Sequence, residues 1–230
     1  MSEAASEAAP RLRVDAVSVR RGGRALLDGV SFAAHRGEIV GVIGPNGAGK
    51  TTLFEAVAGL IPDAAGRVTR EGGLFYLPDG IRPWADQRAG WCLDFFARLF
   101  NRKRDDEAMD ALQLGHLLRQ RAGSLSKGES KRLALALALG TPQPVLLLDE
   151  PFDGLDFRQT RAAMALLRSR AAAGRTLILS IHQLTDAARI CERFLLLDHG
   201  RAIAEGDLPA LRARVGQPDA TLEEVFLALE

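Results

Sequence analysis

The chain has few cysteines, almost no net charge and no long apolar run. Cys92 and Cys191 are too few for a disulfide framework or a four-cysteine metal site, and two small buried thiols suit a reducing compartment. The 30 Lys and Arg residues nearly balance the 29 Asp and Glu residues, which leaves a net charge of +1. The overall charge therefore gives no reason to expect a nucleic acid or an anionic lipid surface as partner.

Signals for secretion or membrane insertion are missing as well. No stretch approaches the roughly 18–20 consecutive apolar residues that a bilayer span requires. Residues 1–10 are rich in Ala, Ser and Glu and have neither the basic nor the apolar region of a secretory signal. We expect a short disordered tail there. These features predict a cytoplasmic protein that works at a membrane only through a partner.

What remains is typical of a folded domain, with 47% hydrophobic and 26% charged residues in a chain of 230. Apolar runs alternate with helical patterns along the chain, which predicts a parallel sheet covered by helices on both faces. We expect its strands at 38–43, 145–148, 176–181 and 194–198, and its helices at 49–58, 158–173 and 185–192. Residues 12–19 alternate apolar and polar side chains as a half-buried strand does, and a turn at Gly22-Gly23 leads to a second strand at 25–33 that is interrupted at Asp28-Gly29. We expect these strands to form an N-terminal antiparallel subdomain.

An inserted α-helical subdomain is expected between about residues 83 and 135. Helical spacing covers 91–100 and 107–118, with Asp105 as a helix cap. Residues 133–139 alternate Leu and Ala with the period of a strand, but both are strong helix formers and Ser126 to Glu129 forms a capping box upstream. We therefore expect a helix there, and a last helix at 221–229.

A phosphate-binding loop lies between the strand at 38–43 and the helix that follows it. The motif G-x-x-x-x-G-K-[ST] is matched by Gly44-Pro45-Asn46-Gly47-Ala48-Gly49-Lys50-Thr51. Its glycines let successive backbone amides point into one concavity, at the positive end of the helix. Lys50 can then reach the β- and γ-phosphates, Thr51 can offer a hydroxyl to Mg²⁺, and Thr52 adds a donor. These features predict a P-loop NTPase core.

A second half of this site is expected where the strand at 145–148 ends in Asp149 and Glu150. Ligands of open α/β sheets gather at the carboxyl ends of the strands. Asp149 is predicted to hold Mg²⁺ through water. Glu150 is predicted to polarise an attacking water.

From about residue 12 to residue 229 the chain resembles the ATP-binding subunits of ABC transporters. Leu125-Ser126-Lys127-Gly128-Glu129 is similar to that family's signature motif, Pro151 to Asp156 to its D-loop and His182 to its switch histidine. The resemblance implies two chains, a homodimer or a pair with a paralogous subunit, that enclose two ATP molecules head to tail. Ser126 and Gly128 would face the γ-phosphate held by the other chain, and His182 would contact the γ-phosphate.

Three positions depart from the family pattern. Arg21 stands near the place of an aromatic residue that stacks on adenine; it is either a stacking substitute or a solvated turn charge. Asp79 replaces a glutamine that helps to ligate Mg²⁺, and it suits either a Mg²⁺ ligand or a plain turn. Lys127 and Glu129 replace a glycine and a glutamine of the signature.

The leading functional hypothesis is an ATPase subunit on the inner face of the cell membrane that drives a separate transmembrane permease. The chain's ending resembles exporter-type subunits. Aromatics at Trp84, Trp91, Phe95 and Phe96 either dock the permease or form the insert's own core. The alternatives are a soluble ATPase of the same superfamily that acts in cofactor or macromolecular assembly, and a nucleotide-binding scaffold without turnover.

Overall fold

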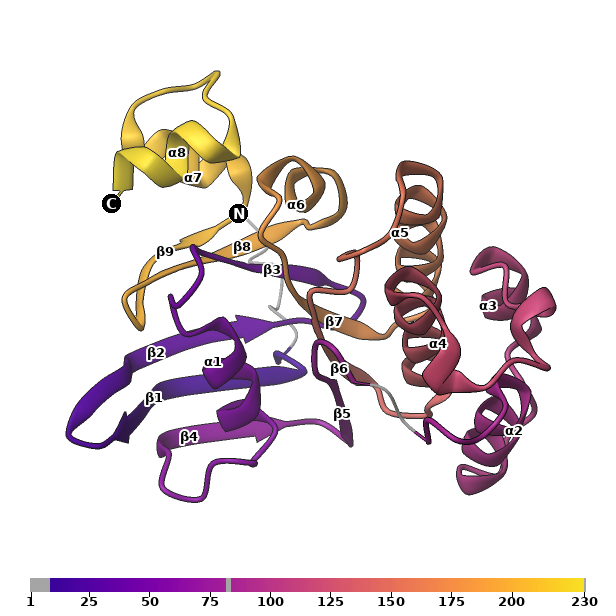
Figure 1. Ribbon diagram of the computed structural model, residues 1–230. Helices are drawn as coiled ribbons and strands as arrows, with labels where there is room; N and C mark the ends of the chain where they lie inside the picture. Colours follow the sequence, from indigo (N-terminus) through magenta and orange to yellow (C-terminus); the bar gives the residue numbers. More distant parts are fainter. Residues whose placement is uncertain (1–8, 82–83, 230) are drawn as a thin grey trace, which may run out of the picture.

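The computed structural model describes residues 9–81 and 84–229, which fold into two sheets flanked by helices (Figure 1). Most of the expected tail, residues 1–8, and Pro83, where the insert was expected to begin, lie outside the described residues. Within the described part of the chain, no helix has both the length and the apolar character needed to cross a bilayer.

The N-terminal strands form a three-stranded antiparallel sheet in the order β2 (Arg24–Ala34), β1 (Leu12–Arg21), β4 (Ala65–Arg70). The predicted interruption at Asp28-Gly29 is wrong, because β2 runs through it. The pairing of β1 with β2 shifts register between Val14 and Val17 and again between Val17 and Val19. Gly29 sits beside this irregularity with φ 67°, a conformation that glycine adopts without strain.

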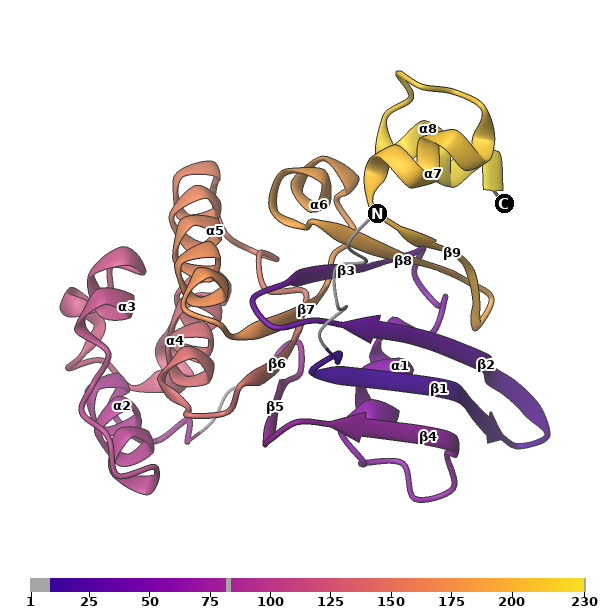
Figure 2. The same ribbon diagram turned by 180° about the vertical axis from the view of Figure 1, so that it is seen from behind.

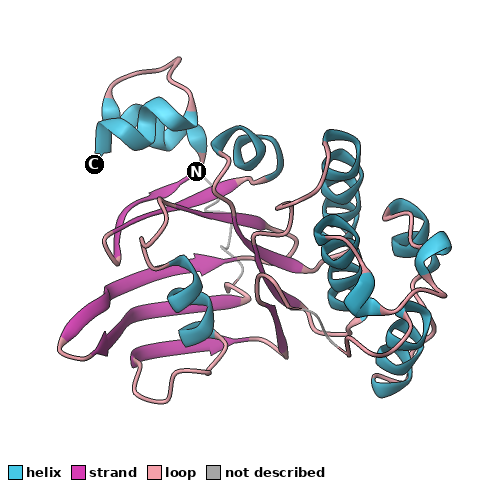
Figure 3. Cartoon of the chain, viewed as in Figure 1, coloured by secondary structure: helices cyan, strands magenta, loops and turns pink. Residues whose placement is uncertain are grey.

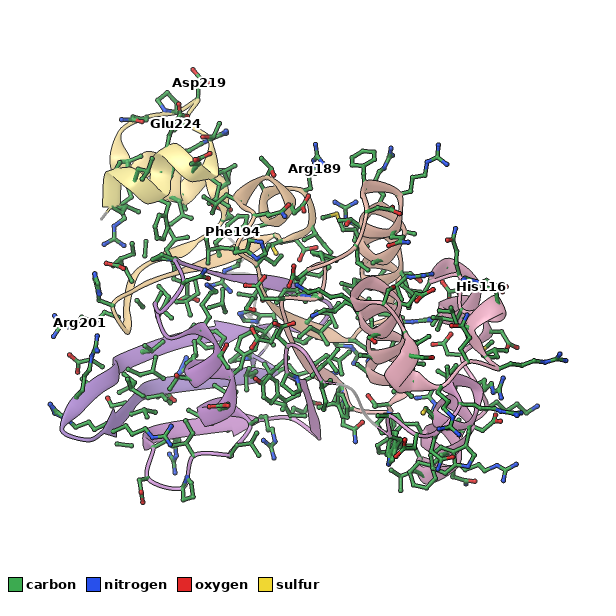
Figure 4. The ribbon with its side chains drawn as sticks, in the orientation of Figure 1. His116, Arg189, Phe194, Arg201, Asp219 and Glu224 are labelled. Carbon is green, nitrogen blue, oxygen red and sulfur yellow. The ribbon has the colours of Figure 1, made fainter. Side chains whose placement is uncertain are left out.

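The second sheet has six strands in the order β5 (Leu74–Leu77), β6 (Val145–Asp149), β7 (Thr176–Ser180), β3 (Ile39–Ile43), β8 (Arg193–Asp198) and β9 (Arg201–Gly206). The first five are parallel, and β9 returns antiparallel through a turn at His199 and Gly200. Arg201, labelled in Figure 4, pairs with Asp28 of β2 at 2.7 Å and so links the two sheets. The parallel strands bring their carboxyl ends to one edge of the sheet.

The helices are α1 (Lys50–Val57), α2 (Ala89–Leu99), α3 (Asp106–Ala111), α4 (Lys127–Gly140), α5 (Phe157–Ala172), α6 (Leu184–Ile190), α7 (Leu208–Val215) and α8 (Leu222–Leu229). The helix predicted over residues 133–139 is confirmed as part of α4. The one predicted over 107–118 is wrong beyond Ala111, since Gln113 has φ 51° and a short 3₁₀ turn follows at Gly115–Leu117. Leu112, Leu114 and Leu117 are all buried, and their spacing does not fit one face of an α-helix.

Each central strand is buried on both faces because it separates two cores. Val40 and Val42 of β3 pack with Phe54 of α1 and with the three-stranded sheet. Ile39 and Ile43 point to the other face, into the core that includes α4 and α5. Figures 1 and 2 both show α4 and α5 on the side of the parallel sheet away from the antiparallel one.

Between residues 84 and 140 the described chain has helices joined by loops and no strand, as Figure 3 shows by colour, and one isolated bridge pairs Arg88 with Arg121. Asp105 caps α3 by accepting a hydrogen bond from the amide of Ala108 at 3.0 Å, as predicted. His116, labelled in Figure 4, lies at the outer edge of this helical part, remote from the carboxyl ends of the parallel strands.

Candidate nucleotide-binding site

The loop after β3 has the backbone shape that phosphate binding requires. Gly49 precedes α1 with φ 105°, and a Cβ built on it would lie 2.9 Å from Leu27 Cδ2 and 3.1 Å from the Leu26 carbonyl oxygen. Only glycine fits there, both for the dihedral angle and for the space. Gly47 is also left-handed, with φ 86°. The amides that open α1 are therefore exposed to an anion at the positive end of the helix.

Lys50 lies inside this loop and is bonded to it. Its Nζ donates to the carbonyl oxygens of Gly44 at 2.7 Å and Pro45 at 3.1 Å, and the residue is only 7% exposed. Burial lowers the pKa of Lys50, and the nearby negative charges of Glu150 and Asp149 raise it by a smaller amount. A buried cation held only by neutral carbonyls is well placed for a phosphate, which would supply the missing counter-charge.

The end of β6 meets the loop at Asp149, which is 3% exposed. Thr51 Oγ1 donates to Asp149 Oδ2 at 2.8 Å, and the hydroxyl of Ser180 donates to the other carboxylate oxygen. Burial and the charge of Asp149 raise the pKa of Tyr76, whose hydroxyl lies 3.5 Å from Asp149 Oδ2. A hydroxyl and a carboxylate oxygen side by side are hard ligands that suit Mg²⁺, so the expected pair fits this ion.

Glu150 is held in an unusual conformation at the same edge. Its φ is 48°, left-handed for a residue with a side chain. Its amide donates to the Ser180 carbonyl at 3.2 Å and to Ser180 Oγ at 2.9 Å, and its Oε2 lies 2.6 Å from His182 Nδ1. Nδ1 can donate to an ionised carboxylate, which only accepts hydrogen bonds.

Most of the predicted residues surround one hollow of about 440 Å³. Its walls include Asn46, Gly47, Gly49, Lys50, Thr51, Thr52, Asp79, Asp149 and Glu150. Leu26, which the sequence did not single out, lines it as well. Arg21 does not: it lies exposed at the end of β1, and its role in base stacking stays a prediction. Asp79 reaches the hollow, but its carboxylate pairs with Lys131 at 2.6 Å.

The signature motif lies outside this hollow. Ser126 caps α4, and Glu129 completes the predicted capping box: Ser126 Oγ accepts from the Glu129 amide at 3.3 Å, and Glu129 Oε2 accepts from the Ser126 amide at 2.8 Å. These hydrogen bonds hold the pKa of Glu129 below its ordinary value. Gly128 packs against the D-loop, since a Cβ there would lie 2.5 Å from the Gly154 carbonyl oxygen.

Two lysines of α4 make contacts that the motifs did not predict. Lys127 Nζ lies 2.6 Å from Asp153 Oδ2 of the D-loop in the same chain, so the side chain that replaces a signature glycine is already paired. The hydrogen bond from Lys127 lowers the pKa of Asp153. Lys131 reaches both Asp79 and the main-chain oxygen of Glu150. Ser180 is the other contributor that was missed, although its position at the end of β7 is a signal of the same kind as Asp149.

Three features together define a P-loop nucleotide hydrolase. They are the phosphate loop that contains Lys50, the hydroxyl–carboxylate pair that suits Mg²⁺, and the Glu150 carboxylate beside His182. Within this class, the signature motif points to one particular family. The motif lies at the capped start of α4, outside the hollow of its own chain. The family described as ABC transporter matches residues 27–153. The chain belongs to this family and is one of its ATP-hydrolysing, ATP-binding subunits.

Individual relatives support this assignment over most of the chain. A hemin import ATP-binding protein of Pseudomonas aeruginosa is 36% identical, covering 83% of this chain and 84% of its own. A Nod factor export ATP-binding protein of Ralstonia nicotianae is 32% identical over 86% of this chain and 67% of its own. A solved ATP-binding subunit of an ABC transporter superimposes with a TM-score of 0.87 at 27% identity, covering 95% of this chain and 98% of that one.

Proposed function

We propose that this chain binds ATP with Mg²⁺ as a head-to-tail dimer on the inner face of the cell membrane, where its hydrolysis drives a separate transmembrane permease. The observation that carries the proposal is the cluster of Lys50, Thr51, Asp149 and Glu150 around one hollow. The comparisons give no support to a role in cofactor or macromolecular assembly. The export relative supports outward transport, whereas the other relative is an import protein. The direction of transport therefore has to be measured.

The chemistry follows from the charges at the hollow. The loop amides and Lys50 would bind the β- and γ-phosphates. Thr51 and Asp149 would hold Mg²⁺, which when bound offsets the negative charge on the phosphate oxygens. Glu150 would accept a proton from water as the water oxygen bonds to phosphorus and the bond to the ADP oxygen breaks. His182 keeps the Glu150 carboxylate aimed through their 2.6 Å contact.

A second copy is needed because the signature does not reach its own P-loop. Ser126 is exposed and Gly128 lies on the D-loop side, both outside the hollow that contains Lys50. The positive end of a helix dipole favours an anion, and this helix begins at the exposed Ser126. The head-to-tail arrangement would bring that end to the terminal phosphate of the other chain and close the hollow to water.

An aromatic surface on the helical part supports permease docking. Trp91 stacks on Phe95 with ring centroids 4.9 Å apart, and Trp84 packs edge-on against Phe95 at 5.2 Å. Phe96 joins the same cluster through Trp84 at 6.1 Å. The rings thus contact one another, yet Trp91 stays 42% exposed and Trp84 and Phe95 each 38%. Partly exposed aromatic clusters of this kind mark interaction sites.

The first part of the test is whether a polytopic membrane protein is encoded beside this chain, and the second part co-expresses the chain with that protein. We expect the chain to co-purify from detergent-solubilised membranes, and permease-containing vesicles to hydrolyse ATP. Trp91→Ala should weaken co-purification and leave hydrolysis by the isolated subunit intact. Glu150→Gln should keep co-purification and ATP binding but slow hydrolysis by about 10²–10⁴-fold. A chain found wholly in the soluble fraction beside an expressed permease would contradict the proposal.

A further inference from the structure

Lys131 connects two parts of the site that no sequence motif links. Its Nζ lies 2.6 Å from Asp79 Oδ1 and donates to the main-chain oxygen of Glu150 at 2.9 Å. The lysine is 7% exposed, whereas the Asp79 side chain is 44% exposed at the edge of the hollow. A buried ammonium group is tolerated only when it is paired and hydrogen-bonded. Both requirements are met here by groups of the nucleotide site.

The Glu150 oxygen that Lys131 binds belongs to a strained residue. Glu150 has φ 48°, and such a conformation persists only where the surroundings hold it. Its amide is held by Ser180, and its carbonyl oxygen accepts from Lys131 and from the amide of Asp153 at 3.2 Å. Lys131 therefore supplies one of the hydrogen bonds that fix the backbone from which the Glu150 carboxylate projects.

Asp79 has its charge committed to this lysine. Its Oδ1 accepts from Lys131, which lies one helical turn after Lys127 on α4. Asp79 follows β5, whereas Asp149, which Thr51 contacts, ends the neighbouring strand β6. The carboxylate of Asp79 thus has a partner of opposite charge without any metal ion.

We propose that Lys131 is a positioning residue for hydrolysis, and that Asp79 acts by holding Lys131 rather than by binding Mg²⁺. The proposal rests on the function proposed above, because it concerns where the Glu150 carboxylate is placed. In the resulting chain of contacts, Asp79 fixes the ammonium group, and the ammonium group fixes the Glu150 carbonyl. The side chain of Glu150 then projects toward His182 from a fixed backbone.

Steady-state hydrolysis of ATP by variants tests this relation. Lys131→Met should lower kcat by about tenfold or more, since small misplacements of a reacting group are costly. The KM for ATP should change by no more than about twofold, because Lys131 does not touch the loop around Lys50. Lys131→Arg should restore part of kcat, since a guanidinium can donate to both acceptors. Lys103→Met, which changes an exposed lysine remote from the hollow, is the matched control.

The role of Asp79 is separated by a double variant and by Mg²⁺ titration. Asp79→Asn should lower kcat without raising the Mg²⁺ concentration needed for half-maximal rate. Asp79→Asn combined with Lys131→Met should be no slower than Lys131→Met alone, because both substitutions break one linkage. A higher Mg²⁺ requirement in Asp79→Asn, or a kcat in Lys131→Met within about twofold of wild type, would overturn the proposal.

Hydrogen exchange decides the structural part without any turnover. Lys131→Met should speed exchange of the Asp153 amide, which shares the Glu150 carbonyl with Lys131. Unchanged exchange there would refute the role of Lys131 even if hydrolysis fell. A wild-type protein that binds but does not hydrolyse ATP would instead refute the proposed function, while the exchange result would still judge Lys131.

Discussion

Removing the hydroxyl of Ser180 should destabilise the protein and slow hydrolysis together. Ser180 ends β7 and is completely buried. Its Oγ donates to Asp149 and accepts from the amide of Glu150 at 2.9 Å, so one atom serves both acidic residues at the end of β6. Ser180→Ala deletes this oxygen and leaves the backbone of β7 unchanged.

The expected magnitude comes from the Asp149 carboxylate, which is 3% exposed and has little access to replacement water. A hydrogen bond to a charged group contributes about 1.5–3 kcal/mol, and the Glu150 amide keeps its contact with the Ser180 carbonyl. A loss of about 2 kcal/mol corresponds to a fall in Tm of about 4–8 °C for a chain of this size. Looser placement of Glu150 should lower kcat by about tenfold or more.

Calorimetry without nucleotide measures the first effect, and phosphate release measures the second. The control is Ser169→Ala, which changes an exposed serine on α5. It should leave both quantities near the wild-type values, as surface substitutions usually do. The reasoning is refuted if Ser180→Ala melts and turns over like Ser169→Ala, because the buried carboxylate would then not depend on the serine hydroxyl.

Two further substitutions test the charges of the site. Lys50→Ala should raise the Kd for ATP about tenfold or more, since it removes a charge-assisted contact to phosphate; a Kd equal to that of Lys103→Met, measured by fluorescent-nucleotide titration, would rule out phosphate binding by Lys50. Lys127→Met should reduce stability at neutral pH, because Lys127 holds the pKa of Asp153 below its ordinary 3.8. This stabilisation is present above pH 3.8 and is lost as pH falls through the lowered pKa. The free energies of unfolding of Lys127→Met and wild type, measured from denaturant curves, should therefore converge in acid. A difference between them that does not change with pH would count against the ion pair.

The sequence predicted those parts of the fold where one segment carries its own signal. Apolar runs such as 145–148 became buried strands because both of their faces meet a core. The helix at 208–215 was not predicted, although Asp207 caps it and Gly216 ends it in the left-handed conformation. With eight residues and few of them buried, it has only a short apolar stripe, so its caps are its main signal.

In the site, too, the residues that could be predicted were those inside a contiguous motif. Lys50, Thr51, Asp149 and Glu150 stand in contiguous motifs, and strand order alone brings the two motifs to one sheet edge. The partners of residues outside the motifs were not predictable, even where a strand-end position such as that of Ser180 was a signal. Ser180 meets Asp149 across β6 and β7, and Lys131 meets Asp79 across α4 and the end of β5. Such pairs depend on register and on helix orientation, which the local pattern of residues does not specify.

The most direct measurement is a crystal structure of the Glu150→Gln protein grown with ATP and Mg²⁺. We predict two chains related head to tail, with the triphosphate on the amides before Lys50 and the γ-phosphate also contacted by Ser126 of the second copy. A nucleotide bound away from Lys50 would contradict the shared-site mechanism. So would a nucleotide bound at the Lys50 loop of a chain whose hollow is not covered by a second copy.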